Sequence, residues 1–295
     1  MIVTLLGVRG SRPVSRMDML RYGGNTTSFK IEVQGVPPIY IDGGTGLYEE
    51  GVRLLSRGVP SKLCIFITHT HWDHMLSFPF FAPMYEEACE VSFYAPISRN
   101  QRFETLIKGQ YNPRAFPVPY DQLKARQTFI DARPGDRFTI GRVTAACFQL
   151  NHPGTTIGWR MEADDQSVVV VTDNAPIEDN RLGEGMEEAY RADPEGFERK
   201  WTEGLIRFMA DADLVIYDTH FTDESIKGKR HWGHSTPTMA IEHAKRARAK
   251  RLLLHHHAPE DTDEAVEHKA AEAWRLAKDT ELDVQPASEG MTIWL

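Results

Sequence analysis

Short runs of apolar and β-branched residues recur along the chain, and several of them end in a histidine or an aspartate. Runs of about four to eight such residues, bounded by turn residues, are typical of buried β-strands. In the first half of the chain this pattern predicts a helix near Leu47–Arg57 and strands at Ile2–Val8, Ser28–Val33, Ile39–Asp42 and Leu63–Thr68. In the second half it predicts helices near Thr238–Ala249 and Ala265–Lys278 and strands at Arg142–Leu150, Thr156–Glu162, Val168–Thr172, Leu214–Tyr217 and Arg251–Leu254.

The helix starts carry capping signals, and the chain shows no linker. Asp193 and Thr236 each precede a proline, which suits the first position of a helix. Proline and glycine are dispersed, and no low-complexity tract separates the two halves. Two similar halves, about 1–135 and 136–295, therefore predict one domain over residues 1–295. Two sheets covered outside by helices make an α/β, four-layer αββα sandwich.

Composition and charge limit the choice of partner. A chain of 295 residues with 41% hydrophobic content can bury a full core. Its net charge of −8 disfavours a large nucleic acid, because nonspecific binding of nucleic acids relies on a positive surface. A small anionic substrate is still compatible with this charge if metal ions supply local positive charge.

Cysteine usage and the chain start indicate the compartment. Cys64, Cys89 and Cys147 are odd in number and lie in apolar segments, which is typical of reduced core residues. The chain begins directly with a strand, and no apolar run approaches the length of a signal peptide core or a membrane span. We therefore expect a cytoplasmic protein without a membrane partner, and a homodimer is an option that the sequence leaves open.

Candidate chemistry begins at residues 67–74, which read ITHTHWDH after an apolar strand. This HxHxDH run contains four candidate metal ligands, namely His69, His71, Asp73 and His74. Three imidazoles and a carboxylate packed together without a cation would leave polar groups unpaired, at a cost of roughly several kcal/mol. The alternative is a histidine-rich surface loop, and the further ligands downstream argue against it.

Three later strands also deliver a histidine or an aspartate at their carboxyl ends, where α/β sheets usually carry their chemistry. His152 follows one of these strands, Asp173 follows the next, and His255–His257 follow Leu252–Leu254. A carboxylate offers two oxygens and suits a bridging position, which we assign to Asp173. The pattern therefore predicts two adjacent metal ions, one held by His69, His71 and His152 and the other by Asp73, His74 and His256.

The chain resembles metallo-β-lactamase-fold hydrolases of the phosphodiesterase branch, which includes ribonuclease Z and class II cyclic-nucleotide phosphodiesterases. The resemblance runs nearly end to end, through HxHxDH, His152, Asp173 and the motifs at Gly7–Ser11, Tyr22–Thr27, Asp42–Gly46, Gly233–Thr236 and His256–Pro259. It implies a sandwich of the metallo-β-lactamase type and a metal-dependent hydrolase. The substrate is less well specified, because one scaffold can host many reactions.

The resemblance also bears on the triple histidine and on Asp42. Matching His257-Ala258-Pro259 to the final motif of the relatives makes His256 the ligand, and alternation along the strand turns His255 and His257 to the other side. Asp42 ends an apolar strand before a glycine-rich turn, where a buried carboxylate could accept a hydrogen bond from a ligand histidine and fix its tautomer. The alternative is an ordinary turn aspartate that caps the next helix.

His234 is the second catalytic candidate. It lies just before a helix whose unpaired N–H groups and dipole favour an anion. In the related nucleases the histidine of the matching His-Ser-Thr motif assists phosphate binding or protonates the leaving group, partnered by an acidic residue. Asp218 is the counterpart that this implies, although the adjacent His220 departs from the ribonuclease pattern. A capping or surface histidine is the alternative for His234, and it is our expectation for His220 and His231.

Substrate contacts are predicted from the loops that this fold places near its metal-bearing face. Arg9 and Arg12 could bind a phosphate through paired hydrogen bonds, with Asn25 and Thr26 beside them. Surface ion pairs are the more frequent explanation of a lone arginine.

The segment Arg99–Arg133 is mildly basic and interleaves Tyr111, Phe116 and Tyr120. It is compatible with a substrate lid, a dimer surface or a nucleic-acid patch. Nothing in it resembles the long Gly/Pro-rich arm by which ribonuclease Z grips transfer RNA, which argues against that activity.

We therefore expect a binuclear metal-dependent hydrolase, specifically a phosphodiesterase that cleaves a small phosphodiester such as a cyclic nucleotide with a metal-bridging hydroxide. Asp73 would orient the hydroxide, and His234 would help the leaving oxygen depart. Imidazole and carboxylate ligands suit two Zn²⁺ ions and also Mn²⁺ or Fe. The alternatives are a lactone or carboxylic ester hydrolase on the same scaffold and a noncatalytic metal-binding sensor.

Overall fold

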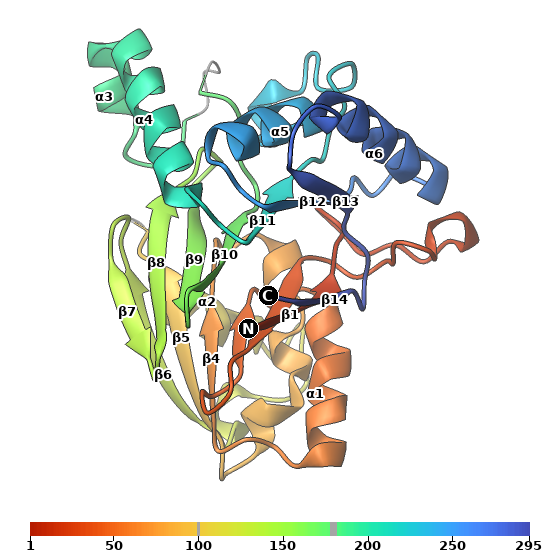
Figure 1. Ribbon diagram of the computed structural model, residues 1–295. Coiled ribbons are helices and arrows are strands. Elements are labelled where there is room, and N and C mark those ends of the chain that lie inside the picture. Colours follow the sequence, from red (N-terminus) through yellow and green to blue (C-terminus); the bar gives the residue numbers. More distant parts are fainter. Residues whose placement is uncertain (99–100, 178–181) are drawn as a thin grey trace.

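The computed structural model describes residues 1–98, 101–177 and 182–295, and two seven-stranded sheets lie at its centre (Figure 1). The first sheet has the strand order β14-β1-β2-β3-β4-β5-β6, and β3 to β6 run parallel to one another. Its strands are β1 (Ile2–Gly7), β2 (Ser28–Glu32), β3 (Ile39–Ile41), β4 (Lys62–Phe66), β5 (Glu90–Pro96), β6 (Arg126–Ala132) and β14 (Thr292–Trp294).

The second sheet has the order β13-β12-β11-β10-β9-β8-β7. Its neighbours β10 to β13 are parallel, whereas β7 to β10 form an antiparallel meander. Its strands are β7 (Arg137–Ile140), β8 (Val143–Gln149), β9 (Ile157–Ala163), β10 (Gln166–Val171), β11 (Leu214–Asp218), β12 (Arg251–His255) and β13 (Asp283–Pro286).

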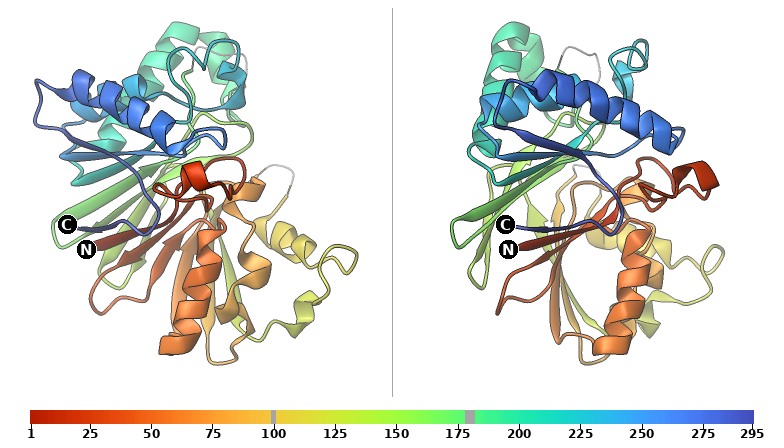
Figure 2. Two further views of the ribbon diagram at one scale, coloured as in Figure 1. Left: turned by 90° about the vertical axis from the view of Figure 1, so that its right-hand side faces the viewer. Right: turned by 45° about the vertical axis from the view of Figure 1, so that its right-hand side comes forward.

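The helices cover the outer face of each sheet. Figure 2 shows α4, α5 and α6 together on one side of the sandwich and α1 with α2 on the other. The helices are α1 (Gly46–Arg57), α2 (Phe103–Gln110), α3 (Glu187–Ala192), α4 (Pro194–Met209), α5 (Pro237–Arg246) and α6 (Asp263–Ala277). The four-layer αββα sandwich predicted from the sequence is therefore confirmed.

The run Val168–Val171 explains why strands of this fold read as continuously apolar. Val168 and Val170 belong to the cluster between the two sheets, whereas Val169 and Val171 pack in the cluster beneath the outer helices. Because both faces of β10 are covered, polar residues have no place in its centre. Trp159 lies in the cluster between the sheets and donates its indole N–H to the Ile67 carbonyl at 3.0 Å, so it ties the second sheet to the first.

Capping follows the predicted signals. The Asp193 side chain accepts a hydrogen bond from the Gly196 amide at 3.0 Å where α4 begins. The Thr236 hydroxyl accepts one from the Met239 amide at 3.5 Å where α5 begins. Each side chain satisfies a donor that the first turn of a helix leaves unpaired.

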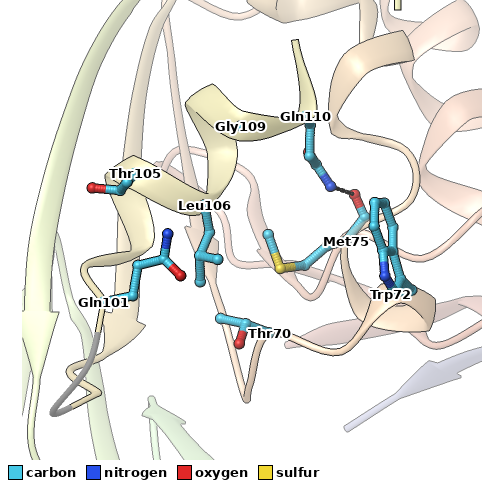
Figure 3. Close-up of a pocket in the computed structure, with 8 residues that line it drawn as sticks. All are labelled: Thr70, Trp72, Met75, Gln101, Thr105, Leu106, Gly109 and Gln110. Carbon is cyan, nitrogen blue, oxygen red and sulfur yellow. Dashed lines mark hydrogen bonds between the residues drawn. The ribbon is translucent and has the colours of Figure 1, made fainter. Parts of the chain in front are cut away.

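The segment after β5 packs onto the domain, and residues 99 and 100 lie outside the described part of the chain. Tyr111 is buried and donates its hydroxyl to the Phe78 carbonyl at 3.1 Å. The Gln110 amide nitrogen at the end of α2 donates to the Met75 carbonyl at 3.0 Å (Figure 3). Phe116 and Tyr120 are partly buried against the same core, so the three aromatic rings are packing residues. A nucleic-acid patch built on them is not what the structure shows.

Five strands in the described residues were not predicted, namely β5, β6, β7, β13 and β14. The strand β14 contains only three residues and pairs with β1 across almost the whole chain, so its identity depends on tertiary contact. Apart from β14, the strands up to β6, which ends at Ala132, form the first sheet, and those from β7, which begins at Arg137, form the second. In the described residues, no helix is both long and apolar enough to span a membrane.

A buried polar pair joins α5 to β11. His243 is buried, and its Nδ1 lies 2.8 Å from the Tyr217 hydroxyl. Burial, and next the charge of Arg246, lower the pKa of His243 from 6.5 to about 4. The folded protein therefore holds this imidazole neutral in weak acid.

We expect acid to destabilise the fold partly through His243. Between pH 6.5 and about 4 the unfolded chain binds a proton on this side chain that the folded chain does not, so the free energy of unfolding falls as the pH drops through this window. His243→Gln removes this titration. When the pH is lowered from neutral to about 5, the unfolding free energy of the variant should therefore fall by roughly 2 kcal/mol less than that of the wild type. Urea unfolding of metal-free protein at several pH values measures the difference, and parallel pH profiles would contradict it.

Candidate binuclear metal centre

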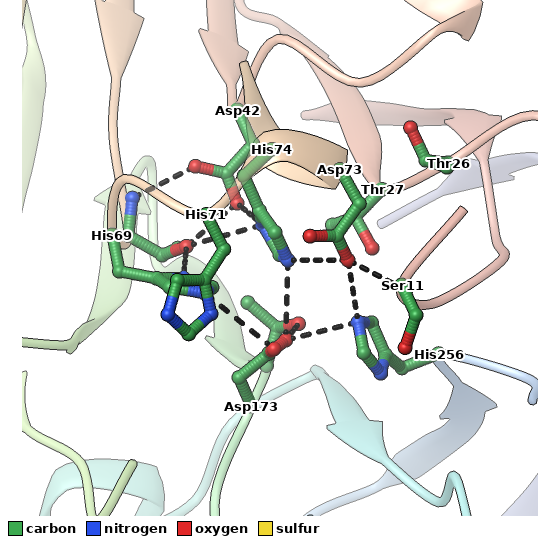
Figure 4. Close-up of polar contacts among 12 residues, drawn as sticks. Ser11, Thr26, Thr27, Asp42, His69, His71, Asp73, His74, Asp173 and His256 are labelled. Atoms are coloured by element: carbon green, nitrogen blue, oxygen red, sulfur yellow. Dashed lines mark hydrogen bonds and ion pairs between the residues drawn. The ribbon is translucent and has the colours of Figure 1, made fainter. Parts of the chain in front are cut away.

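Loops that follow β4, β8, β10 and β12 converge on one point at the edge of the two sheets. Figure 4 shows the ligands that come from the loops after β4, β10 and β12. Three groups of side chains with possible metal-ligand atoms form there, and in each group these atoms all lie within 4.8 Å of one another. One group is His220, His234 and His256. The other two groups, which share Asp173, are His69, His71, His152 and Asp173, and Asp73, His74, Asp173 and His256. The structure thus brings together all seven predicted ligands in the predicted partition, with Asp173 common to both groups.

An unusual backbone conformation orients the side chains of two of these residues. Asp173 follows β10 with φ at 54°, and His256 follows β12 with φ at 61°. Left-handed backbone is uncommon for residues other than glycine and costs on the order of 1 kcal/mol or more, so it is kept where the surroundings demand it. At His256 it turns the ring towards Asp73 and Asp173, with Nε2 3.4 Å and 3.1 Å from their carboxylate oxygens.

The neighbours of His256 point elsewhere. Nε2 of His255 lies 3.2 Å from the Gly7 carbonyl, and Nε2 of His257 lies 2.8 Å from the Ala287 carbonyl. Both rings therefore hydrogen-bond the backbone of other segments. Of the three histidines, His256 alone faces the cluster, as the alternation along the strand predicts.

The spacing around Asp173 fits a shared cation. Its carboxylate oxygens lie 3.5 Å from Nε2 of His69, 3.3 Å from Nε2 of His74 and 3.6 Å from Nε2 of His152. Two ligand atoms bound to one ion at about 2.1 Å in tetrahedral geometry are roughly 3.4 Å apart. Nε2 of His69, His74 and His256 is buried and has no hydrogen-bond partner among the described residues. These imidazoles are left with a lone pair that a metal ion would satisfy.

Two further contacts fix the tautomer of the ligand rings. Asp42 is fully buried, and its Oδ2 lies 2.8 Å from Nδ1 of His74. The Gly233 carbonyl lies 2.8 Å from Nδ1 of His152. A proton held at Nδ1 leaves Nε2 free to face the cluster. Asp42 therefore lies where the sequence predicted a partner for a ligand histidine.

Electrostatics at the centre are dominated by burial and by the three carboxylates. Burial raises the pKa of Asp42, and the neighbouring His74 opposes that rise. Burial would lower the pKa of His74, but Asp73, Asp173 and Asp42 together hold it well above its ordinary value, so a metal ion that binds Nε2 of this ring displaces a proton. Burial also keeps the pKa of His152 at about 3, so this ring is neutral and can act as a ligand at physiological pH.

A histidine–aspartate pair lies beside the cluster. Nδ1 of His234 is 2.9 Å from Oδ2 of Asp218, and both side chains are buried. Burial would lower the pKa of His234, but the Asp218 carboxylate outweighs it and raises this pKa. The pair predicted from the His-Ser-Thr motif is therefore assembled. Nδ1 of His234 lies 3.9 Å from Oδ2 of Asp173.

His220 was expected to be a surface or capping histidine, and that expectation is wrong. Its ring is 3% exposed and stacks on His234, with the ring centres 4.5 Å apart. The Asp218 carboxylate accepts a hydrogen bond from the His220 amide at 2.9 Å, which turns the chain so that the ring enters the site. His231 is exposed, as expected.

The structure contradicts two of the four predicted substrate contacts. Arg9 is fully buried, and its guanidinium donates to the carbonyls of Gly23, Ala258 and Asp261. Thr26 is also fully buried, with its amide on the Thr45 hydroxyl at 2.9 Å. These residues build the loops and are closed to a substrate.

The other two predicted contacts lie on the surface. The Asn25 side chain bonds Glu289 at 2.6 Å, which occupies its amide group. Arg12 is exposed and lies 3.7 Å from Glu260, a surface ion pair. Asn25 is therefore a loop residue, and of the predicted substrate contacts Arg12 alone is exposed and reachable by a ligand.

Several residues that shape the site were missed in the sequence. The Ser11 amide donates to Oδ2 of Asp73 at 2.7 Å, and the Thr68 hydroxyl donates to Oδ2 of Asp42 at 2.7 Å. Backbone amides leave no trace in a side-chain pattern, and Thr68 reads as an ordinary strand residue. Gly233 could have been found, because it precedes the predicted catalytic histidine.

Two facing sheets with this cluster of histidines and aspartates at their common edge are the arrangement of a metallo-β-lactamase fold with a candidate metal centre. Residues 38–257 match the family model described as the beta-lactamase superfamily domain. The chain therefore belongs to the beta-lactamase superfamily.

Individual relatives and structures agree with this assignment. The ribonuclease Z of Natronomonas pharaonis is 24% identical over 282 residues, covering 86% of each chain. The metallo-β-lactamase fold protein YhfI of Bacillus subtilis superposes with a TM-score of 0.67 at 19% identity, covering 99% of both chains. A diphosphatase of the PhnP family superposes with a TM-score of 0.63 at 17% identity, covering 100% of this chain and 97% of its own. At these identities the two structures show the fold alone.

We expect protein loaded with zinc to carry about two ions per chain, because two groups of ligands share Asp173. Asp173→Ala should lose most of both ions, whereas loss of a ligand confined to one group should spare the other ion. Asp211→Ala, which removes an exposed partner of Arg248, is the matched control. Elemental analysis after reconstitution measures the content, and trace metal in the wild type would contradict the binuclear centre.

Gly233→Ala should damage the group that contains His152. Gly233 has φ of +90°, and a Cβ there would lie 2.3 Å from Nδ1 of His152. Gly228→Ala carries a similar backbone penalty, since Gly228 has φ of +77° but nothing within 4 Å of its Cβ. We expect metal content to fall in the Gly233 variant alone. Equal metal content in both variants would show that the contact with His152 is dispensable.

Proposed function

We propose that the protein is a binuclear metal-dependent phosphodiesterase that acts on a small phosphodiester, such as a cyclic nucleotide. The observation that carries this proposal is the His234–Asp218 pair beside the cluster of seven ligands. Phosphodiester cleavage with an alkoxide leaving group needs both activation of water and a proton for the leaving oxygen. The two parts of the site match these two needs.

Asp73 is proposed to orient the attacking water. Its Oδ2 is fixed by the Ser11 amide at 2.7 Å and faces His74 and His256, each 3.4 Å away. Burial would raise the pKa of Asp73, but His74 and His256 hold it well below its ordinary value. The carboxylate is therefore available as an acceptor over the whole physiological range.

His234 is proposed to donate a proton from Nε2 to the leaving oxygen. The Asp218 carboxylate holds the proton at Nδ1 and favours the doubly protonated ring. As the water oriented by Asp73 adds to phosphorus and loses a proton to solvent, the bond from phosphorus to the leaving oxygen breaks and that oxygen takes the proton from His234. His220, stacked on His234, excludes water from one face of the ring.

The two groups of ligands would hold two divalent ions, for which we propose Zn²⁺ because imidazole nitrogen with carboxylate oxygen suits zinc, and Mn²⁺ or Fe as alternatives. Bound ions of this kind polarise a phosphoryl oxygen and bring the pKa of a coordinated water towards neutrality. The contribution of the chain is to fix their positions, through Asp173 between the groups and through Asp42 and Gly233 behind the rings.

We propose a small anionic substrate although several of the curated relatives are named ribonuclease Z. A net charge of −8 does not favour transfer RNA. The segment from 101 to 133 folds against the core through Tyr111 and does not extend as an arm. Cys64, Cys89 and Cys147 are unpaired and buried, which is compatible with work in the cytoplasm. A homodimer stays a prediction.

The direct test is an activity screen of the zinc-loaded protein against phosphodiesters, phosphomonoesters, lactones and thioesters. Hydrolysis of small phosphodiesters well above the other classes would support the proposal. Preference for lactones or thioesters would replace it with a carbonyl hydrolase. Absence of turnover with both ions in place would favour a metal-binding sensor.

His234→Ala should damage turnover of an alkyl phosphodiester far more than that of a nitrophenyl phosphodiester, because nitrophenolate departs without a proton. We expect a loss of roughly a hundredfold or more on the alkyl substrate. The metal content should stay close to that of wild type. His231→Ala, an exposed histidine of the same loop, is the control. Equal losses on both substrates would instead make His234 a phosphate-binding residue.

A further inference from the structure

A cavity of about 270 Å³ lies between the HxHxDH loop and helix α2 (Figure 3). Part of its wall is the loop itself, and the rest is α2 with the residues just before it. Its lining residues are Thr70, Trp72, Met75, Gln101, Thr105, Leu106, Gly109 and Gln110. None of them is among the seven ligands or the His234–Asp218 pair.

The cavity adjoins the metal centre through the chain itself. Thr70 and Trp72 flank the ligand His71, and Met75 follows the ligand His74. The cavity and the centre thus share the residues of one loop, and a group attached to a phosphate at the centre reaches the cavity by extending along this loop. His71 is the one ligand of its group that is exposed, so the centre is open to solvent on the loop that also lines the cavity.

Trp72 is the most unusual part of this wall. Its side chain is 69% exposed although it lies between the predicted ligands His71 and Asp73. A large aromatic ring left in solvent at the rim of a cavity offers a flat surface on which another ring can stack. Met75 and Leu106 give the cavity an apolar interior beneath it.

Gln110 contributes a buried hydrogen-bond acceptor to this wall. Its amide nitrogen donates to the Met75 carbonyl at 3.0 Å, which fixes the orientation of the amide. The other end of the amide, Oε1, is buried and has no hydrogen-bond partner among the described residues. A buried acceptor without a donor is costly, so this oxygen calls for an N–H or O–H group from a ligand.

We propose that this cavity binds a planar nitrogen heterocycle with an N–H group, namely the base of a nucleoside phosphodiester. The base stacks on Trp72 and donates to Oε1 of Gln110 while the phosphate lies at the metal centre. This assignment rests on the proposed phosphodiesterase function and names its substrate class. Sites for whole drug-sized ligands measure roughly 300–1,000 Å³. A cavity of about 270 Å³ is therefore sized for one base.

An aliphatic substituent fits these residues less well. It would fill the apolar interior, but it would leave the Gln110 oxygen unpaired and would make no use of the flat face of Trp72. A sugar could donate to Gln110, but its puckered ring stacks poorly on an indole. The heterocycle satisfies both features at once.

The test compares substrates that share one reacting bond. Uridine 2′,3′-cyclic phosphate and methyl riboside 2′,3′-cyclic phosphate differ only in the presence of the base, and N3-methyluridine 2′,3′-cyclic phosphate lacks the N–H donor. Phosphorus NMR follows hydrolysis by the zinc-loaded protein. We expect kcat/KM for uridine to exceed that for methyl riboside by roughly tenfold or more, because stacking of one base on an aromatic ring has about this effect.

The variants assign the preference to the cavity. Trp72→Ala should bring the ratio of uridine to methyl riboside close to one, and Trp72→Phe should retain most of it. Gln110→Met should abolish the preference for uridine over N3-methyluridine. Trp294→Ala, which removes a tryptophan that is 71% exposed on β14, is the matched control and should keep both ratios. Metal analysis of each variant checks that the centre is intact.

Calorimetry separates this inference from the proposed function. Binding of uridine 3′-phosphate and of methyl riboside 3′-phosphate to the zinc-loaded protein repeats the comparison without turnover. A base preference in binding that Trp72→Ala removes, without hydrolysis of any cyclic phosphate, would support the cavity and overturn the phosphodiesterase. Hydrolysis with equal rates and equal affinities for both compounds would overturn the cavity and leave the phosphodiesterase standing. A preference that persists in Trp72→Ala and Gln110→Met would place the base elsewhere and overturn the inference.

Discussion

The buried carboxylate of Asp173 is the point on which the rest of the site depends. Nitrogens of four histidines from the loops after β4, β8 and β12 lie between 3.1 and 3.6 Å from its oxygens. An isolated carboxylate at this depth would be strongly unfavourable, and burial alone would raise its pKa, yet the surrounding imidazoles hold the pKa well below its ordinary value. The two sheets are therefore joined at this edge by charge as well as by the apolar core.

The orientation of the ligand rings is fixed by residues that do not themselves face the metal centre. Asp42 and the Gly233 carbonyl each occupy Nδ1 of one ring, and the Thr68 hydroxyl in turn bonds Asp42 at 2.7 Å. Such outer contacts commonly change metal affinity by about 10- to 100-fold when they are lost. The same logic extends to His234, whose proton is placed by Asp218. Function here depends on buried hydrogen bonds that determine which nitrogen carries a proton.

The sequence predicted the parts of this molecule that follow from local pattern. Runs such as Val168–Val171 revealed the strands covered on both faces, and HxHxDH with its later partners revealed the ligands. Pattern could not find β14, because three residues gain their identity only by pairing with β1. It also misplaced Arg9, since an arginine on a predicted loop gives no sign that backbone carbonyls will occupy its donors. His220 was missed because stacking on a ring distant in sequence is a tertiary contact.

The pairing of β14 with β1 has a consequence for how the chain reaches this structure. Ile2 lies opposite Trp294 in that ladder, and the Leu295 amide donates to the Met1 carbonyl at 3.0 Å. One edge of the first sheet can thus be closed only after residue 294 has been synthesised, although β1 is made much earlier. Contacts of such long sequence separation form slowly, and an unpaired edge strand is prone to wrong partners. The nascent chain must therefore keep β1 from pairing wrongly while the residues between β1 and β14 are synthesised.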